Sequence, residues 1–156
     1  MSTIRKVLQL LAASALPVLA APLYPEPSRA ETDIASAESE AAASHRRVLV
    51  DFGGDWCTDC KVFDAYLKRP ENAALVQRYV IVHVNVGAKG ITENFSIARR
   101  YGIPLEKGVP ALAVLDEKGR VIHSQKSGEF EDMRHMSPDA VHDFLQQWSG
   151  SAQGLK

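Results

Sequence analysis

The chain has 156 residues, of which 46% are hydrophobic and 24% are charged, and its formal net charge at pH 7 is −1. A slightly acidic balance of this kind argues against a protein that binds nucleic acid or an anionic membrane surface through a basic face. The length suits one domain with one core and leaves no room for a second full domain.

The first segment, residues 1–20, has the pattern of a secretory signal peptide. Arg5 and Lys6 precede an apolar run over 7–21 that contains small residues where a signal peptidase would cut. This run is shorter than the roughly 20 residues that a membrane-spanning helix needs. We therefore expect export without stable membrane insertion, to the periplasm if the cell is Gram-negative. Cleavage after Ala20 would leave 16 Lys and Arg against 19 Asp and Glu, a net charge of 16 − 19 = −3.

The composition after the signal peptide changes at about residue 30. Three prolines within 21–29 indicate an extended chain, whereas 30–44 is rich in Ala and Glu and favours a helix. We place an N-terminal tether at 21–34, a single domain at 35–148 and a flexible tail at 149–156.

The first half of the domain has the pattern of strand, helix and strand. The short apolar run over 48–52 suits a buried strand. Apolar residues at helical spacing predict a helix over 57–67, and a second helical stretch over 71–79 precedes a Val-rich strand over 80–86. Two strands joined through helices indicate a parallel crossover.

The second half adds a helix, a hairpin and a final helix. The pattern over 92–101 is helical, and two short apolar runs over 111–115 and 120–124 flank a turn, which predicts a hairpin. Ser137 is the expected cap of a helix over 138–148. The expected fold class is therefore α/β, with a central mixed β-sheet flanked by helices in three layers.

The two cysteines of the chain, Cys57 and Cys60, lie three positions apart. A bridge that closes so short a loop would stabilise the fold little, so we expect the pair to work in thiol-disulfide exchange. Cys57 is the expected nucleophile, because unpaired N–H groups and the helix dipole at a helix start favour a thiolate. Cys60, one turn further into the helix, is the expected resolving thiol.

The residues around this pair resemble the active-site segment of the thioredoxin family, over 50–61: Val-Asp-Phe-Gly-Gly-Asp-Trp-Cys-Thr-Asp-Cys-Lys. Within that family, 54–57 together with 61–63 is most similar to the C-terminal thioredoxin-like domain of the DsbD group of periplasmic thiol:disulfide interchange proteins. The resemblance extends over about 35–148. It implies a thioredoxin-like fold and the activity of a protein-disulfide reductase.

The resemblance also implies a substrate-binding surface. The family's cis-proline corresponds to Pro110 in the sequence Gly-Val-Pro-Ala. A cis bond at this position would leave the backbone of Val109 available to pair with an extended substrate segment. Trp56 would flank the exposed sulfur and add an apolar docking surface.

A buried acidic residue of the family, six positions before the first cysteine, corresponds to Asp51. Asp51 could accept the proton of Cys60 during resolution, and the alternative is a purely structural carboxylate. His83, on the neighbouring strand, could be the partner of Asp51 or an ordinary strand histidine.

Two features depart from the family pattern. Asp59 stands where many thioredoxins have a proline, and an anion near Cys57 disfavours its thiolate. We therefore predict a reductase or an electron relay and not a strong oxidant.

The stretch 104–107 lengthens the approach to Pro110. This longer loop could determine which partners bind, or it could have no effect on function.

The chain shows no Gly-rich phosphate loop and no flavin or nicotinamide motif, so we expect no cofactor. The expected partners are disulfide-containing client proteins and a membrane or soluble thiol-disulfide electron donor, and we expect a monomer.

Two other functions stay open. An exported pair such as Cys57 and Cys60 could instead carry Cu(I) on its soft sulfurs, with Met133, His135 and Met136 together in one loop, although we expect no metal site. A locked disulfide would suit a non-catalytic interaction module.

Overall fold

The computed structural model describes residues 21–150. The expected signal peptide over 1–20, and the part of the expected tail beyond residue 150, lie outside the described residues. Four strands form one mixed sheet in the order β2-β1-β3-β4. Their bounds are Arg47–Gly53 for β1, Tyr79–Asn85 for β2, Ala111–Leu115 for β3 and Val121–Ser124 for β4. Strand β1 pairs in parallel with β2 and antiparallel with β3, and β3 and β4 form the predicted hairpin.

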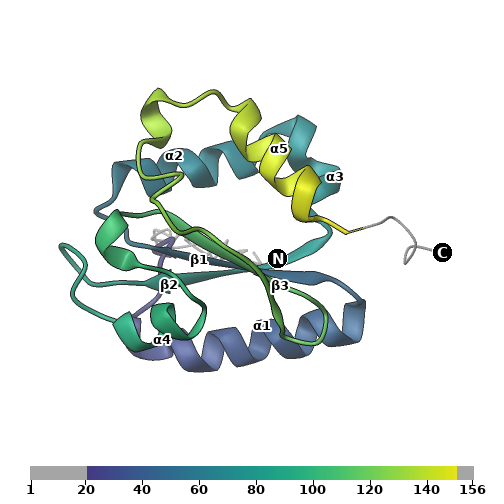
Figure 1. The fold of residues 1–156 in the computed structure, drawn as a ribbon, viewed down its shortest axis with the longest axis horizontal. Coiled ribbons are helices and arrows are strands. Elements are labelled where there is room, and N and C mark those ends of the chain that lie inside the picture. The colour runs from purple at the N-terminus through teal and green to yellow at the C-terminus, as the bar shows by residue number, and fades with distance from the viewer. Residues whose placement is uncertain (1–20, 151–156) are drawn as a thin grey trace, which may run out of the picture.

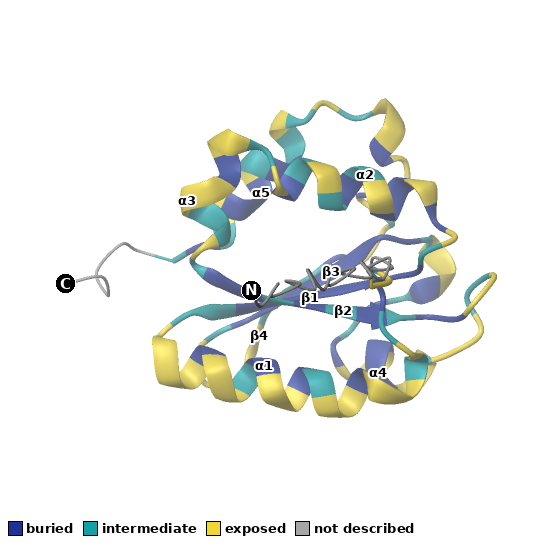
Figure 2. Cartoon of the chain, turned by 180° about the vertical axis from the view of Figure 1, so that it is seen from behind, coloured by how far each residue is buried: buried dark blue, intermediate teal, exposed yellow. Residues whose placement is uncertain are grey.

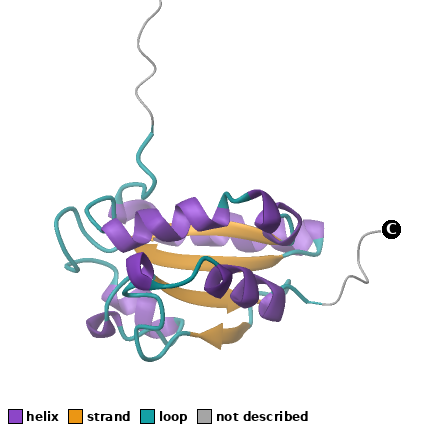
Figure 3. Cartoon of the chain, turned by 90° about the horizontal axis from the view of Figure 1, so that it is seen from above, coloured by secondary structure: helices purple, strands orange, loops and turns teal. Residues whose placement is uncertain are grey.

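Helices cover both faces of this sheet (Figure 1). Helices α2, α3 and α5 lie on one face, and α1 and α4 lie on the other. Figure 3 shows the strands as one layer between them. The α-helices span Ala30–Ser44, Thr58–Leu67, Ala73–Val76, Phe95–Arg100 and Asp139–Trp148, and the 3-10 turns η1 to η4 span Pro27–Arg29, Pro70–Asn72, Leu105–Lys107 and Met133–His135. The predicted three-layer thioredoxin-like fold is confirmed. Within 21–150, no helix is long and apolar enough to cross a membrane.

Strand β1 is the centre of the core, buried from Val48 to Gly53 (Figure 2). Because successive strand residues point to opposite faces, β1 contributes to two separate clusters. Val48 and Val50 belong to the cluster that includes α1, whereas Leu49 packs with Phe63 of α2. A strand held from both faces is a rigid support for the residues that follow it.

Two predicted helices are shorter than expected. The stretch 71–79 contains only the end of η2 and the one-turn α3, because Tyr79 pairs with Arg47 in the sheet and its buried hydroxyl donates to the Leu145 carbonyl at 2.7 Å. The stretch 92–101 is helical only over α4. Asn94 adopts a left-handed φ of 59° immediately before α4, and its side-chain amide donates to the carbonyls of Pro27 and Asn85.

The segment 21–34 is not the free tether that the prolines suggested. Tyr24 is 1% exposed, and α1 begins at Ala30 and buries Ile34 in the same cluster. The amide of Asn85 donates to the Pro25 carbonyl at 2.9 Å, which ties this segment to the end of β2. The packed domain therefore starts before Tyr24 and not at residue 35, because a proline-rich sequence reports local backbone irregularity and not long-range burial.

Candidate active site

The cysteine pair lies at the junction of β1 and α2. A turn in which the Cys57 N–H donates to the Gly54 carbonyl at 2.9 Å connects the strand to the helix. Cys57 is the N-cap of α2, and it forms a disulfide with Cys60 with the two Cα atoms 5.3 Å apart. Cys57 is 6% exposed and Cys60 is fully buried. Of the two sulfurs, that of Cys57 is the one that a partner reaches first.

The start of α2 favours negative charge on the Cys57 sulfur. The Cys60 N–H points at Cys57 Sγ, with the two atoms 3.1 Å apart. The first N–H groups of a helix have no partner within the helix, and they carry the positive end of the helix dipole. In the reduced protein this arrangement stabilises a Cys57 thiolate, which is the reactive form in disulfide exchange.

The Val109–Pro110 segment faces the pair from the start of β3. The peptide bond between these two residues is cis, and the Val109 carbonyl oxygen lies 3.6 Å from Cys57 Sγ. The pairing of Ala111 with Phe52 of β1 fixes this segment opposite the cysteines. Within 21–150, neither the N–H nor the carbonyl of Val109 bonds to another backbone group. An extended peptide could therefore pair with Val109.

A groove of about 290 Å³ opens beside Cys57. It is lined by Trp56, Cys57, Thr58, Asp59, Ile91, Gly108, Val109, Glu131 and Arg134. Trp56 is 38% exposed, and its indole N–H donates to the Gly87 carbonyl at 2.7 Å, which fixes the ring at the rim. The groove thus combines an aromatic surface, free backbone groups and the more accessible sulfur.

Asp59 is not the isolated anion that the sequence suggested. Its carboxylate accepts hydrogen bonds from the backbone N–H of Arg134 at 2.9 Å and from the Arg134 Nε at 3.1 Å. Arg134 lies in η4, which packs beside the start of α2 in Figure 1. The charge of Asp59 is therefore largely offset. Glu131 is the second acidic residue of the groove, so its lining carries two negative groups and one positive group.

Asp51 is fully buried on β1 and shares one carboxylate oxygen between two partners. Its Oδ2 accepts a hydrogen bond from the Tyr24 hydroxyl at 2.7 Å and lies 2.8 Å from His83 Nδ1. Asp51 and His83 are register partners on adjacent strands, so the sheet itself brings them together. Burial lowers the pKa of His83, but the hydrogen bond and the charge of Asp51 raise it more, and the net shift is upward.

Sequence reasoning missed two residues of this site, Tyr24 and Arg134. Tyr24 is an aromatic residue inside a proline-rich segment, and nothing nearby in the sequence indicates that it is buried. Burial and the neighbouring charge of Asp51 raise the pKa of Tyr24 well above its usual value, so the phenol stays neutral. Arg134 lies 75 residues from Asp59, and no local pattern links the two.

The three residues suggested as copper ligands differ in their surroundings. Met133 is fully buried in the core with Phe63, whereas the His135 side chain is 75% exposed and bonds to Asp132 at 2.6 Å. Met136 packs against the same core cluster. Within 21–150, no group of three or more His, Cys, Asp or Glu side chains has the arrangement of a metal site.

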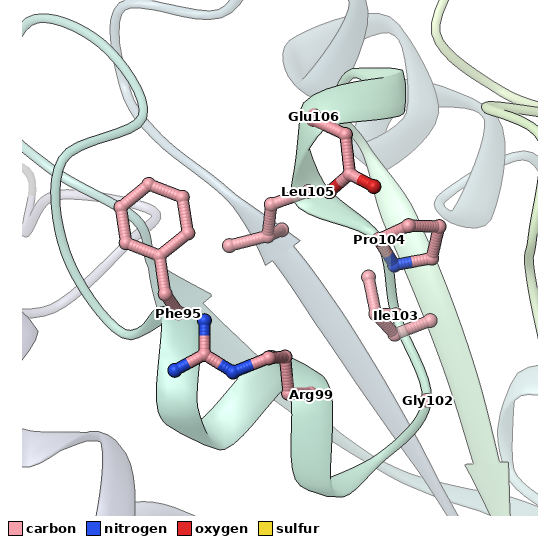
Figure 4. A pocket seen from close by; sticks show the side chains of 7 residues that line it. All are labelled: Phe95, Arg99, Gly102, Ile103, Pro104, Leu105 and Glu106. Carbon is pink, nitrogen blue, oxygen red and sulfur yellow. The ribbon is translucent and has the colours of Figure 1, made fainter.

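The lengthened stretch 104–107 forms η3 and lies away from the cysteine groove. It lines a separate hollow of about 270 Å³ together with α4 (Figure 4). Phe95 is 40% exposed at this hollow, while Leu105 is buried. The two hollows share no lining residue, so the stretch does not contribute a side chain to the surface beside Cys57.

Comparisons with known proteins agree with this geometry. A family model described as thioredoxin-like matches residues 29–117. The thiol:disulfide interchange protein DsbD of Photorhabdus laumondii is 26% identical over 105 residues, which cover 64% of this chain and 17% of that protein. The chain thus spans less than a fifth of the length of this relative. The crystal structure of a disulphide isomerase from Xylella fastidiosa Temecula1 is 30% identical with a TM-score of 0.76, and the match covers 83% of this chain and 98% of that chain.

Proposed function

Because the chain belongs to the thioredoxin-like family, we propose that it is an exported thiol-disulfide oxidoreductase that reduces the disulfides of client proteins through Cys57 and Cys60. The observation that carries this proposal is the position of Cys57. Its sulfur is the more accessible of the pair, it lies at the start of α2, and it faces the unpaired backbone of Val109. A buried structural staple needs none of these features.

The reaction follows from the two sulfurs. The reduced Cys57 thiolate attacks one sulfur of a client disulfide, which forms a Cys57–client bond and releases the other client sulfur as a thiolate. Cys60 then loses its proton and attacks Cys57 Sγ, which releases the second client sulfur. The client gains two electrons and ends as a dithiol, and the enzyme ends as the Cys57–Cys60 disulfide present in the structure. Asp51 is the proposed acceptor of the Cys60 proton.

Client binding uses the groove beside Cys57. An extended client segment adds main-chain hydrogen bonds to Val109, in the manner of a strand that pairs with an exposed edge. The Trp56 ring supplies an apolar surface next to the attacked disulfide. Pro110 follows Val109 and leads directly into β3, which begins at Ala111.

We propose that the enzyme donates electrons and does not install disulfides. A strong oxidant needs an unusually stabilised thiolate in its reduced form. The groove lining has two acidic groups, Asp59 and Glu131, and one basic group, Arg134, so its charge gives the Cys57 thiolate no extra stabilisation. A measured reduction potential near −120 mV, roughly that of the strong oxidant DsbA, would overturn this direction.

The oxidised pair must be reduced again in each cycle. We propose that another thiol-disulfide protein, soluble or in the membrane, supplies these electrons, by analogy with the interchange protein that the chain resembles. Export is proposed from the leader-like pattern of residues 1–20, and in a Gram-negative cell the compartment would be the periplasm. We also keep the proposal of a monomer.

Trapping of clients tests this function. A Cys60→Ala variant cannot resolve the mixed disulfide, so it should accumulate covalent adducts with client proteins that dithiothreitol releases. A matched Cys57→Ala variant keeps only the buried sulfur and should accumulate none. Equal and reductant-insensitive capture by both variants would show a docking module, and stoichiometric Cu(I) binding by the reduced wild type without insulin reduction would show a metallochaperone.

A further inference from the structure

We propose that Tyr24, from the segment before α1, relays the proton of Cys60 to Asp51 during resolution. The inference rests on the proposed function, because it concerns the second step of the same exchange. Tyr24 lies 33 positions before Cys57 in the sequence. The fold nevertheless brings its hydroxyl to the buried carboxylate of Asp51 and into the neighbourhood of the buried Cys60 sulfur.

Because Gly53 has no side chain, there is space beside it in which the Tyr24 hydroxyl and Cys60 Sγ approach each other. A Cβ atom on Gly53 would lie 2.5 Å from the Tyr24 hydroxyl oxygen and 2.8 Å from Cys60 Sγ. These two atoms are therefore separated by no more than the sum of those distances, a span that one bridging water can cover. On its other side, the same hydroxyl donates to Asp51 Oδ2 at 2.7 Å.

Several contacts hold the Tyr24 hydroxyl in this place. The backbone N–H groups of Leu23 and Tyr24 donate to the two carboxylate oxygens of Asp55 at 3.1 and 3.4 Å. The Tyr24 ring packs edge-on against the His83 ring, with the centroids 5.2 Å apart. The side chain is 1% exposed, so bulk water does not replace it as a path to the carboxylate.

A neutral phenol can pass a proton without a net change of its own. Cys60 gives its proton to the Tyr24 oxygen through one bridging water as the Tyr24 proton moves to Asp51 Oδ2, and the resulting Cys60 thiolate attacks Cys57 Sγ. The client thiolate leaves with the electron pair of the broken sulfur–sulfur bond. The other carboxylate oxygen of Asp51, Oδ1, is buried without a hydrogen-bond partner among the described residues.

The charges around Tyr24 agree with this role. Burial, followed by the charge of Asp51, keeps the pKa of Tyr24 high, and the more distant Asp64 and Asp55 act in the same direction. His83 faces Asp51 from β2, and Lys68, the residue after α2, lies within electrostatic range of His83. Tyr24 therefore remains a proton carrier and does not become a phenolate at the pH of the reaction.

The test isolates the resolution step with an aryl disulfide such as 5,5′-dithiobis(2-nitrobenzoate). The fully reduced protein releases one thionitrobenzoate when Cys57 attacks and a second when Cys60 resolves, and stopped-flow absorbance follows both phases. In Tyr24→Phe the first phase should match wild type. The second phase should be at least about 10-fold slower at pH 6 and should approach the wild-type rate by pH 9, where the thiol ionises without help. Tyr101→Phe, which removes a hydroxyl that donates to Glu38, is the matched control.

The outcomes distinguish failure of the Tyr24 relay from failure of the proposed thiol-disulfide function. A second phase unchanged in Tyr24→Phe, or slowed by the same factor at every pH, overturns the relay and leaves the proposed function intact. A wild-type protein that releases no thionitrobenzoate refutes the proposed function and the relay with it. Asp51→Asn should reproduce the pH profile of Tyr24→Phe, and the double variant should be no slower than either single variant. If Tyr24→Phe does not fold, Asp55→Ala replaces it, because it removes the contacts that hold the Tyr24 backbone. The second phase of Asp55→Ala must then be slowed at pH 6, and an unchanged second phase rejects the relay.

Discussion

Replacement of Tyr24 by alanine should destabilise the oxidised protein by several kcal/mol. The Tyr24 ring is 1% exposed, and removal of a buried aromatic side chain costs about 3–5 kcal/mol. The hydroxyl adds a hydrogen bond to the carboxylate of Asp51, and a bond to a charged group contributes about 1.5–3 kcal/mol. Tyr24→Phe, which keeps the ring, should therefore lose only this second, smaller amount.

Urea unfolding at pH 7, followed by circular dichroism, measures both variants against wild type. The m-value should not change, because the same surface is exposed on unfolding. A residue in a solvated tether would alter the free energy of unfolding by no more than about 0.5 kcal/mol. A loss below about 1 kcal/mol in Tyr24→Ala would refute our placement of this segment inside the domain core.

Two further predictions concern charge. The raised pKa of His83 means that its pairing with Asp51 stabilises the fold fully below the unfolded pKa of about 6.5 and loses this contribution as the pH rises through the higher folded value. The gap in unfolding free energy between wild type and His83→Gln should thus be about 1 kcal/mol larger at pH 6 than at pH 9, and an equal or larger gap at pH 9 would contradict the pairing. Arg134→Ala should expose the charge of Asp59 to Cys57 and make the reduction potential about 10–20 mV more negative. Asp59→Asn, measured in the same glutathione redox buffers, should shift the potential in the opposite direction, and shifts of the same sign would exclude this charge effect.

The central elements were predictable because their signals are local. A run of β-branched and apolar residues defines β1 and β2 whatever else the chain contains, and alternation then assigns their two faces. The spacing of Cys57 and Cys60, next to the end of β1, marks the reactive pair in the same way. These features need no knowledge of distant residues.

The remaining parts of the site depend on contacts between segments far apart in the sequence. The burial of Tyr24 depends on contacts with Asp55 and Asn85, and the charge of Asp59 is offset by its ion pair with Arg134. A proline-rich segment and an exposed loop look alike in the sequence whether or not they pack. For this reason the domain boundary and the charge beside Cys57 both differed from expectation.

The anchorage of Tyr24 also sets when the redox centre becomes complete during folding. Tyr24 precedes every strand of the sheet in the sequence, yet its segment is fixed by Asp55 and by Asn85, 31 and 61 residues later. Domains generally fold as units once enough of the chain has emerged. A chain in which β2 has not yet joined the sheet therefore carries both cysteines but has no fixed phenol near them, so its thiols resemble those of an unfolded peptide until the sheet has formed.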